Sequence, residues 1–357
     1  MFFHLLKKLI KFINQPVYIN ASIPPYLSIA DLFCLTRKPR EWLRGGVRFK
    51  TIGTVLSIFL FFNCSTFKTV SREQLNSLDI PERFEIKGVP FFEQEAYQCG
   101  PAVLAMALVW SGVRVMPDTV APEVFTPALD GSLQSALIGA ARRHGRVAYP
   151  VSEMASMLKE LASGHPVIVL QNLALSWIPK WHYSLAVGYD RTDNLIILHS
   201  GKTERKLLPF SVFERTWRRS KYWGLVVLPP DVLPATAEEG EYVSSIAGLE
   251  RAQRWNEALK AYINALNKWP ENYVAHIGMG NCYYYLGDLN AAEVVFRGII
   301  FRFPNKGAGF NNLAQVLLEQ GKYNEAFDTI QAAIRIDGAA VEQYQQTLEE
   351  IQIKRNR

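Results

Sequence analysis

Cys99 is the residue whose type and setting best fit nucleophilic chemistry. It is followed by Gly100 and Pro101, which favour a tight entry into a first helical turn, and then by the apolar run 102–109. A helix that is apolar all round is buried. The dipole and free N–H groups at a helix start favour a thiolate over a thiol. Cys99 is therefore a candidate nucleophile, although an isolated cysteine more commonly serves only as core packing.

A nucleophilic cysteine needs a base close in space, and His182 is the best candidate. It opens the apolar segment 183–189, which predicts a strand, and a turn at 190–194 and a second strand at 195–198 follow. A histidine at the mouth of a central strand can point at the end of a helix. The other histidines lie in the leader, at a helix end, in a turn, beside the second strand or in a repeat: His4, His144, His165, His199 and His276.

Charge and cysteine distribution argue against several other classes of function. Nine of the 39 basic residues but only two of the 33 acidic residues lie in positions 1–50, so the remainder has 30 basic and 31 acidic side chains. The body therefore carries no surplus charge for nucleic acid. No CxxC spacing or disulfide framework connects the four cysteines, Cys34, Cys64, Cys99 and Cys282. We expect no cofactor, and Cys99, His182 and His199 are better explained by nucleophilic chemistry than as metal ligands.

Composition along the chain predicts two domains with a leader and linkers. Residues 84–228 mix helical and strand patterns and contain both chemical centres. The Pro-rich segment 229–237 ends that domain. Residues 238–337 are helical. The remaining segments are a leader at 1–63, a linker at 64–83 and a C-terminal helix or tail at 338–357.

The helical part repeats with a period of 34 residues. Segments 255–258, 289–292 and 323–326 share a pattern that ends in alanine, and a large side chain recurs in phase at Tyr262, Phe296 and Ile330. Period and phase resemble tetratricopeptide repeats. Stacked helix pairs form a groove, so the repeats either bind a protein partner or only cap and rigidify the first domain.

The residues around the two chemical centres resemble a known family. Gln94 precedes the run 99–102 (Cys-Gly-Pro-Ala) by five positions, and His182-Tyr183 and the segment 187–190 (Val-Gly-Tyr-Asp) follow. This pattern resembles the double-glycine leader peptidases that process bacteriocins. It is most similar to a bacterial group in which such a domain is a lipoprotein with a tetratricopeptide tail. The resemblance implies an α+β papain-like cysteine peptidase domain followed by an all-α tetratricopeptide solenoid.

The resemblance also implies a role for each site residue. Cys99 would attack the scissile carbonyl, and His182 would take the thiol proton and later protonate the leaving amine. Gln94 would form the oxyanion hole together with the backbone N–H of Cys99. Many papain-like enzymes show a spacing of six, so Gln98 is a second candidate, although its position beside Cys99 fits a local helix cap better.

The third member of the site departs from the family pattern. The leader peptidases place an aspartate after the second strand to orient the histidine, whereas Ser200 falls nearest that position here. A hydroxyl orients an imidazole more weakly than a carboxylate does. Asp190 and Asn194 are alternatives, although both look like turn residues. A working dyad, a slow enzyme and an enzyme that needs activation are all compatible with this departure.

The region before the first domain predicts export. The uncharged segment 51–62 is too short to span a membrane and has the length of a signal-peptide core. Cys64 follows it and resembles the lipid-attachment cysteine of bacterial lipoproteins. Ser65 after that cysteine favours the outer over the inner membrane, with the body on the periplasmic side.

Residues 1–46 do not fit a signal peptide, and three interpretations stay open. The true start could lie near Val47. Residues 1–13 could instead form a basic amphipathic helix on a membrane. Residues 1–63 could also be a single leader.

Together these expectations describe a cysteine peptidase that hydrolyses peptide bonds through a Cys99–His182 dyad. It would be exported and lipid-anchored, act on a peptide or protein substrate, and bind a protein partner through its repeats. Trp177 and Trp181 could line the substrate cleft or pack in a loop. Transpeptidation or amide hydrolysis on the same dyad stays open, as does a catalytically weak or inactive peptide-binding scaffold.

Overall fold

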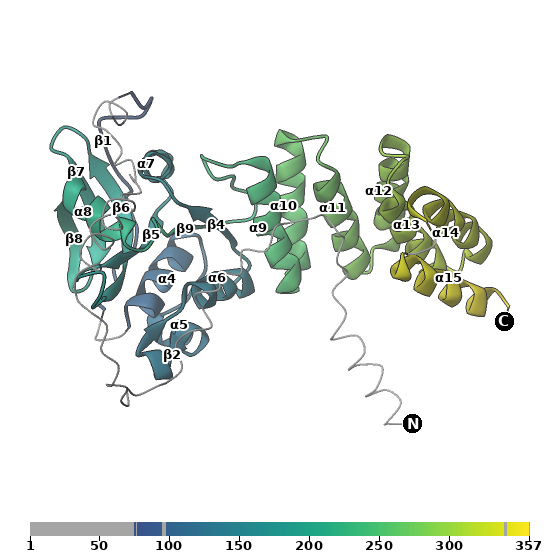
Figure 1. The fold of residues 1–357 in the computed structure, drawn as a ribbon, viewed down its shortest axis with the longest axis horizontal. Helices are drawn as coiled ribbons and strands as arrows, with labels where there is room; N and C mark the ends of the chain where they lie inside the picture. Colours follow the sequence, from purple (N-terminus) through teal and green to yellow (C-terminus); the bar gives the residue numbers. More distant parts are fainter. Residues whose placement is uncertain (1–74, 76, 95–97, 339–340, 357) are drawn as a thin grey trace, which may run out of the picture. The chain divides into compact units, whose positions relative to one another are not determined.

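The computed structural model describes residues 75, 77–94, 98–338 and 341–356 (Figure 1). The predicted signal core at 51–62 and the predicted lipid-attachment residue Cys64 lie outside the described residues. None of the helices in the described ranges is long and apolar enough to cross a membrane.

A seven-stranded antiparallel sheet forms the centre of the first domain. Its strands run in the order β4-β9-β5-β6-β7-β8, and β1 pairs with the end of β6. The bounds are Arg83–Glu85 (β1), Val147–Val151 (β4), Val167–Asn172 (β5), Trp181–Asp190 (β6), Leu195–Ser200 (β7), Thr203–Pro209 (β8) and Gly224–Leu228 (β9). A separate hairpin consists of β2 (Phe125–Thr126), a short 3₁₀ turn at Pro127–Leu129 and β3 (Gly131–Ser132). The strands predicted after His182 are confirmed as β6 and β7.

Helices cover both faces of this sheet (Figure 1). The first face packs against α4 (Cys99–Trp110), α5 (Pro117–Val124) and α6 (Gln134–Arg143) through residues such as Leu185. The second face packs against α7 (Met154–Ala162) and α8 (Phe210–Arg218) through residues such as Ala186. Because successive strand residues point to opposite faces, His182 and Ser184 lie on the face of Ala186. The mixed helix-and-sheet class predicted for this domain is confirmed.

The sequence around Cys99 explains why α4 starts there. Pro101 occupies the first turn, where its missing N–H costs nothing, and residues 100–108 are all buried. Gly100 lies so close to β3 that a Cβ at this position would collide with the side chain of Ser132. The buried helix predicted from the apolar run is confirmed, and glycine is needed beside the cysteine.

Helices alone make up the second part of the described chain. Their bounds are Glu239–Arg251 (α9), Trp255–Lys268 (α10), Tyr273–Tyr285 (α11), Leu289–Arg302 (α12), Gly307–Glu319 (α13), Tyr323–Asp337 (α14) and Glu342–Arg355 (α15). Consecutive helices pack as pairs. The residues that recur every 34 positions fill the helix contacts, since Tyr262, Phe296 and Ile330 are all buried. Gly278 and Gly280 leave room for the rings of Tyr262 and Phe296. The predicted repeats are therefore confirmed.

A buried carboxylate holds the linker against the first domain. Glu160, at the end of α7, accepts hydrogen bonds from Nδ1 of His165 (2.7 Å) and from the backbone N–H groups of Ala235 (3.1 Å) and Thr236 (2.8 Å). Burial would raise the pKa of Glu160, but these hydrogen bonds hold it below its ordinary value. The charged carboxylate therefore fixes the path from β9 into α9.

Candidate active site

The thiol of Cys99 lies at the N-terminal end of α4 and is partly buried. Burial raises the pKa of the Cys99 thiol, even though the backbone N–H groups of Tyr183, Gly100 and Cys99 itself hydrogen-bond the sulfur and favour the thiolate. The N–H groups at the helix start favour the thiolate as expected, but burial has the larger effect. Desolvation of the sulfur outweighs the N–H groups that the helix start supplies.

His182 lies at the start of β6 as a neutral base. Its Nε2 is 3.0 Å from Oγ of Ser200 on β7. Burial, with smaller contributions from Lys206 and Lys180, lowers the pKa of His182 to about 4. The imidazole is therefore uncharged at pH 7. The thiol of Cys99, whose pKa is raised, is uncharged at this pH as well.

The fold brings the sulfur of Cys99 to the backbone beside His182, although 83 positions separate the two residues in the sequence. The sulfur accepts a hydrogen bond from the backbone N–H of Tyr183, the residue that follows His182. Within the described residues the sulfur contacts backbone N–H groups and Nε2 of His182 contacts Ser200, and no hydrogen bond joins the thiol to the imidazole. Such bonds are often long in substrate-free enzymes and tighten in the complex.

Gln94 places a buried amide beside Gly201, the residue that follows Ser200. It is 6% exposed, its backbone N–H donates to the carbonyl of Gly201, and its Oε1 accepts the N–H of Gly201, both at 3.0 Å. Its Nε2 is buried and has no hydrogen-bond partner within the described part of the chain. An unsatisfied buried donor costs about 1–3 kcal/mol. Among the described residues, Nε2 of Gln94 is thus a buried donor without an acceptor.

Ser200 contacts the imidazole, whereas the two alternative orienting residues do not. Asp190 pairs with Arg83 at 2.9 Å. Asn194 occupies the turn between β6 and β7 with a φ of 56°. Gln98 stands at the N-cap of α4, but its side chain makes no capping hydrogen bond. The helix cap predicted at Gln98 is confirmed in position, although its backbone ψ of 15° is not the extended geometry in which a side chain caps.

His199 points to the opposite face of the sheet from His182. Its Nδ1 donates to the carbonyl of Glu204, and its ring packs edge-on against Phe91. Over the ranges that the structure describes, no group of three His, Cys, Asp or Glu side chains could hold a metal ion. Cys282 is buried in the repeats, where burial raises the pKa of its thiol.

Two exposed tryptophans lie in the loop between β5 and β6 (Trp177) and at the first position of β6 (Trp181). Trp177 is 75% exposed and Trp181 is 50% exposed, so neither packs in the core. Oδ1 of Asn172 accepts the backbone N–H of Lys180 at 3.0 Å, and Arg219 donates to the carbonyl of Asn172 at 3.1 Å. These hydrogen bonds connect the loop to β5 and Arg219, while both tryptophans are exposed to solvent.

Sequence reasoning missed the polar side chains behind Ser200. Oγ of Ser184 is 2.9 Å from Oγ of Ser200 and 3.1 Å from Oε1 of Gln171. Nε2 of Gln171 is 2.8 Å from the hydroxyl of Thr216 on α8. Ser184 and Gln171 are polar residues inside apolar strands. That position could have identified them, because buried polar groups almost always have partners.

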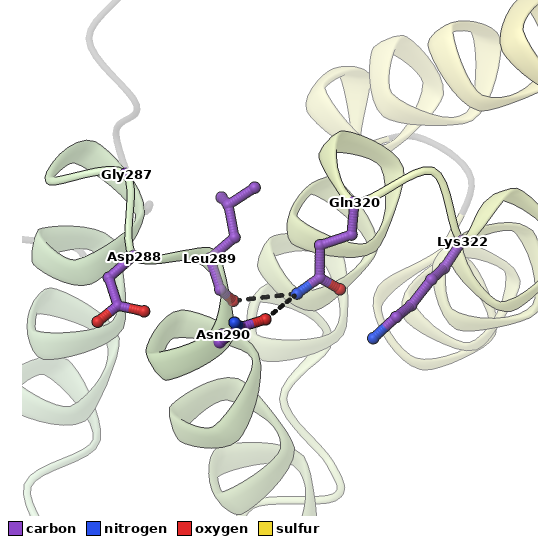
Figure 2. A pocket seen from close by; sticks show the side chains of 6 residues that line it. All are labelled: Gly287, Asp288, Leu289, Asn290, Gln320 and Lys322. Atoms are coloured by element: carbon purple, nitrogen blue, oxygen red, sulfur yellow. Dashed lines mark hydrogen bonds between the residues drawn. The ribbon is translucent and has the colours of Figure 1, made fainter.

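The repeats contain a polar hollow of about 450 Å³ between the turn before α12 and the end of α13. Figure 2 shows Gln320 reaching toward Leu289 and Asn290, with hydrogen bonds of 3.3 and 3.4 Å. Asp288 and Lys322 also line it. The side chain of Asp288 caps α12 by accepting the N–H of Ala291, so it already has a structural role. The hollow contains no nucleophile and base, and we assign it no catalytic function.

Comparison with protein families gives a match for each domain. Residues 86–224 match the Peptidase_C39 like family, and residues 249–310 match the tetratricopeptide repeat. The two matches confirm the domain types predicted from the motif around Cys99 and from the 34-residue period. The search of curated proteins found no match.

Several solved structures are similar to one of the two domains. A C39-like peptidase from Bacillus anthracis is 16% identical, with 42% of this chain and 98% of that chain covered and a TM-score of 0.36. The peptidase domain of Streptococcus ComA, a bi-functional ABC transporter involved in a quorum sensing pathway, is 17% identical, with 39% and 96% covered and a TM-score of 0.33. The Sgt2 TPR domain from Aspergillus fumigatus is 17% identical, with 34% and 81% covered and a TM-score of 0.33.

Proposed function

Because residues 86–224 are a Peptidase_C39-like domain and residues 249–310 are tetratricopeptide repeats, we propose that this chain is a cysteine peptidase with a partner-binding tail. The peptidase domain hydrolyses peptide bonds through Cys99 and His182. The repeats bind a protein or peptide.

Acylation starts from the neutral pair. As Sγ of Cys99 attacks the scissile carbonyl carbon, its proton passes to the free nitrogen of His182. The carbonyl oxygen becomes an oxyanion, which accepts hydrogen bonds from Nε2 of Gln94 and from the backbone N–H of Cys99. The intermediate collapses, the C–N bond breaks, and His182 gives its proton to the leaving amine. The acyl group is left as a thioester on Cys99.

Deacylation returns the enzyme to its starting state. A water molecule attacks the thioester carbon while His182 takes one of its protons. The C–S bond then breaks and the leaving thiolate recovers that proton from His182. The products are a carboxylic acid and the free thiol, so atoms and charges balance over the cycle.

The observation that carries this proposal is the unpaired donor of Gln94. Nε2 of Gln94 is buried and has no partner in the part of the chain that the structure describes. Oε1 of Gln94 accepts the N–H of Gly201, which directly follows Ser200, the residue that contacts His182. In the proposed mechanism this buried donor, which is unpaired among the described residues, binds the oxyanion that appears during the reaction.

Substrate capture with the full chain tests the proposal. The variant Cys99→Ala serves as bait for periplasmic proteins, and captured proteins are then incubated with wild type while mass spectrometry detects new N-termini. We expect cleavage by wild type and by Cys282→Ala, since Cys282 lies in the repeat core. We expect none with Cys99→Ala or His182→Ala. Captured proteins that stay intact with wild type would contradict peptidase activity.

A peptide-binding scaffold is the competing function, and one observation favours it. The resting pair has no charge, and a hydroxyl stands where the resembling enzymes have a carboxylate. A scaffold would bind the same peptide with equal affinity in wild type and Cys99→Ala, and would leave it intact after prolonged incubation.

Export and lipid attachment at Cys64 are part of the proposal and are supported by the apolar segment 51–62 that precedes it. Detergent phase partition of the full chain tests this. Wild type and Cys34→Ser should enter the detergent phase, and Cys64→Ser should stay in the aqueous phase. Equal partition of the Cys64 variant and wild type would rule out the anchor.

A further inference from the structure

A chain of hydrogen bonds between uncharged side chains runs from His182 along one face of the sheet to α8. It passes from Nε2 of His182 to Ser200 (3.0 Å), to Ser184 (2.9 Å), to Gln171 (3.1 Å) and to Thr216 (2.8 Å). Ser184, Ser200 and Gln171 are at most 5% exposed. Bulk water therefore does not compete for these bonds, and each group must find its partner within the chain.

The hydrogen bonds of Thr216, at the far end of this chain, determine which group donates and which accepts at every step. The hydroxyl of Thr216 lies 2.8 Å from the carbonyl of Phe213 and 3.2 Å from that of Val212. A carbonyl oxygen can only accept, so the single proton of Thr216 is donated to α8. Oγ1 of Thr216 must then accept from Gln171, which places Nε2 of Gln171 toward Thr216 and leaves Oε1 toward Ser184.

The donor and acceptor of each remaining hydrogen bond follow in order back to His182. Oε1 of Gln171 accepts the proton of Ser184, so Oγ of Ser184 accepts the proton of Ser200. With its only proton donated to Ser184, Oγ of Ser200 can only accept from His182. Nε2 of His182 must therefore carry a hydrogen, and Nδ1 is the unprotonated nitrogen.

We propose that Ser184, Gln171 and Thr216 are positioning residues that hold His182 in its Nε2–H tautomer through Ser200. A carboxylate beside a histidine fixes the tautomer because it can only accept. Here a backbone carbonyl of α8 imposes the same constraint from three side chains beyond Ser200. The benefit to catalysis rests on the proposed peptidase function, whereas the tautomer itself does not.

The proposal makes a distinctive prediction for Thr216→Val, which is nearly isosteric. Without Oγ1 of Thr216, the amide of Gln171 loses its anchor and can turn its NH₂ group toward Ser184. The direction of the chain then reverses, Ser200 donates to Nε2, and His182 moves toward the Nδ1–H tautomer. Thr216→Ser keeps the hydroxyl and should keep the wild-type tautomer.

Long-range ¹H–¹⁵N spectra of the histidine-labelled full chain at pH 7 measure the tautomer directly. The resonance of His182 is assigned by its loss in His182→Ala. We expect Nε2–H in wild type and in Thr216→Ser, and a shift toward Nδ1–H in Thr216→Val and Ser184→Ala. Thr329→Val is the matched control, because the Thr329 hydroxyl also donates to its own helix, at 2.7 Å, but lies in the repeats. It should leave the spectrum unchanged.

Kinetics give a second readout. If the proposed peptidase function holds, Thr216→Val lowers kcat about tenfold or more with KM unchanged, because only the wrong tautomer is populated while substrate contacts stay intact. The spectra decide the proposal even if no activity is found. An Nδ1–H tautomer in wild type, or an unchanged Nε2–H tautomer in folded Thr216→Val and Ser184→Ala, would overturn it.

Discussion

The alkylation rate of Cys99 as a function of pH is the sharpest test of the uncharged resting pair. Many cysteine nucleophiles rest as a thiolate beside an imidazolium, which gives a rate plateau on the acid side of neutrality. In this protein burial raises the pKa of the Cys99 thiol above an ordinary value of 9.0 and lowers the pKa of His182 to about 4. We therefore expect no plateau.

The magnitude follows from these two values. Moving the proton from the thiol to the imidazole costs at least about 7 kcal/mol, since the pKa values differ by at least the gap between 9.0 and about 4. Even if the two resulting charges were only about 4 Å apart, their attraction would return about 4 kcal/mol at an effective dielectric constant of about 20. The ion pair is then below about 1% of molecules, and the thiolate below about 1% at pH 7.

The assay is iodoacetamide alkylation of the full chain between pH 4 and 10, with Cys99 followed by peptide mass spectrometry. The rate should rise about tenfold per pH unit up to the thiol pKa, and His182→Ala should follow the same profile within a small factor. Cys282 in the same sample reports on global unfolding, because it is fully buried. A plateau from pH 5 to 8 that disappears in His182→Ala would refute the reasoning, since only an ion pair produces it.

Three further predictions concern the donor, the base and the linker. Gln94→Leu should lower kcat about 10²–10³-fold with little change in KM, because it removes one oxyanion donor; steady-state kinetics check this. The acid limb of the pH profile of kcat/KM should lie near pH 4 rather than 6.5, because His182 must be neutral to accept the thiol proton. Lys206→Gln should move this limb to higher pH, because the charge of Lys206 helps to lower the pKa of His182. Glu160→Gln should lower the free energy of unfolding by about 2–4 kcal/mol in denaturant titrations. The matched variant Glu123→Gln should cost less than about 1 kcal/mol, because this carboxylate is partly exposed where it pairs with Arg143 and His144. Because the folded pKa of Glu160 lies below its unfolded value, the difference from wild type should shrink as the pH falls through that folded value.

The elements that position the site could be predicted because each depends on local rules. The Cys-Gly-Pro entry and the apolar run fixed the start of α4. The alternation after His182 and the turn at 190–194 predicted the hairpin of β6 and β7. The 34-residue period placed the buried residues of the repeats. In each case the pattern spans one element or one repeat, so long-range contacts were not needed.

The protonation states and the chain behind Ser200 could not be predicted in the same way. The pKa of Cys99 depends on how far the surrounding elements desolvate the sulfur, and that burial is set by packing from distant segments. Gln171, Ser184 and Thr216 come from β5, β6 and α8, and only the sheet order brings them together. The helix cap predicted at Gln98 was right in position, but residue type alone does not specify the backbone ψ that decides whether the side chain forms a capping hydrogen bond.

Three electrostatic features of the site favour the state in which both the thiol and the imidazole are uncharged. A buried thiol, a buried imidazole with Lys206 and Lys180 nearby, and a hydroxyl in place of a carboxylate each disfavour charge in the resting protein. A carboxylate at position 200 would stabilise the imidazolium and oppose the effect of burial on His182. With a hydroxyl there, charge develops only as the sulfur attacks. In the proposed mechanism, the transition state must then be stabilised by groups that bind the developing charge. Gln94 and the N–H of Cys99 therefore contribute more to transition-state stabilisation than the residues that orient His182.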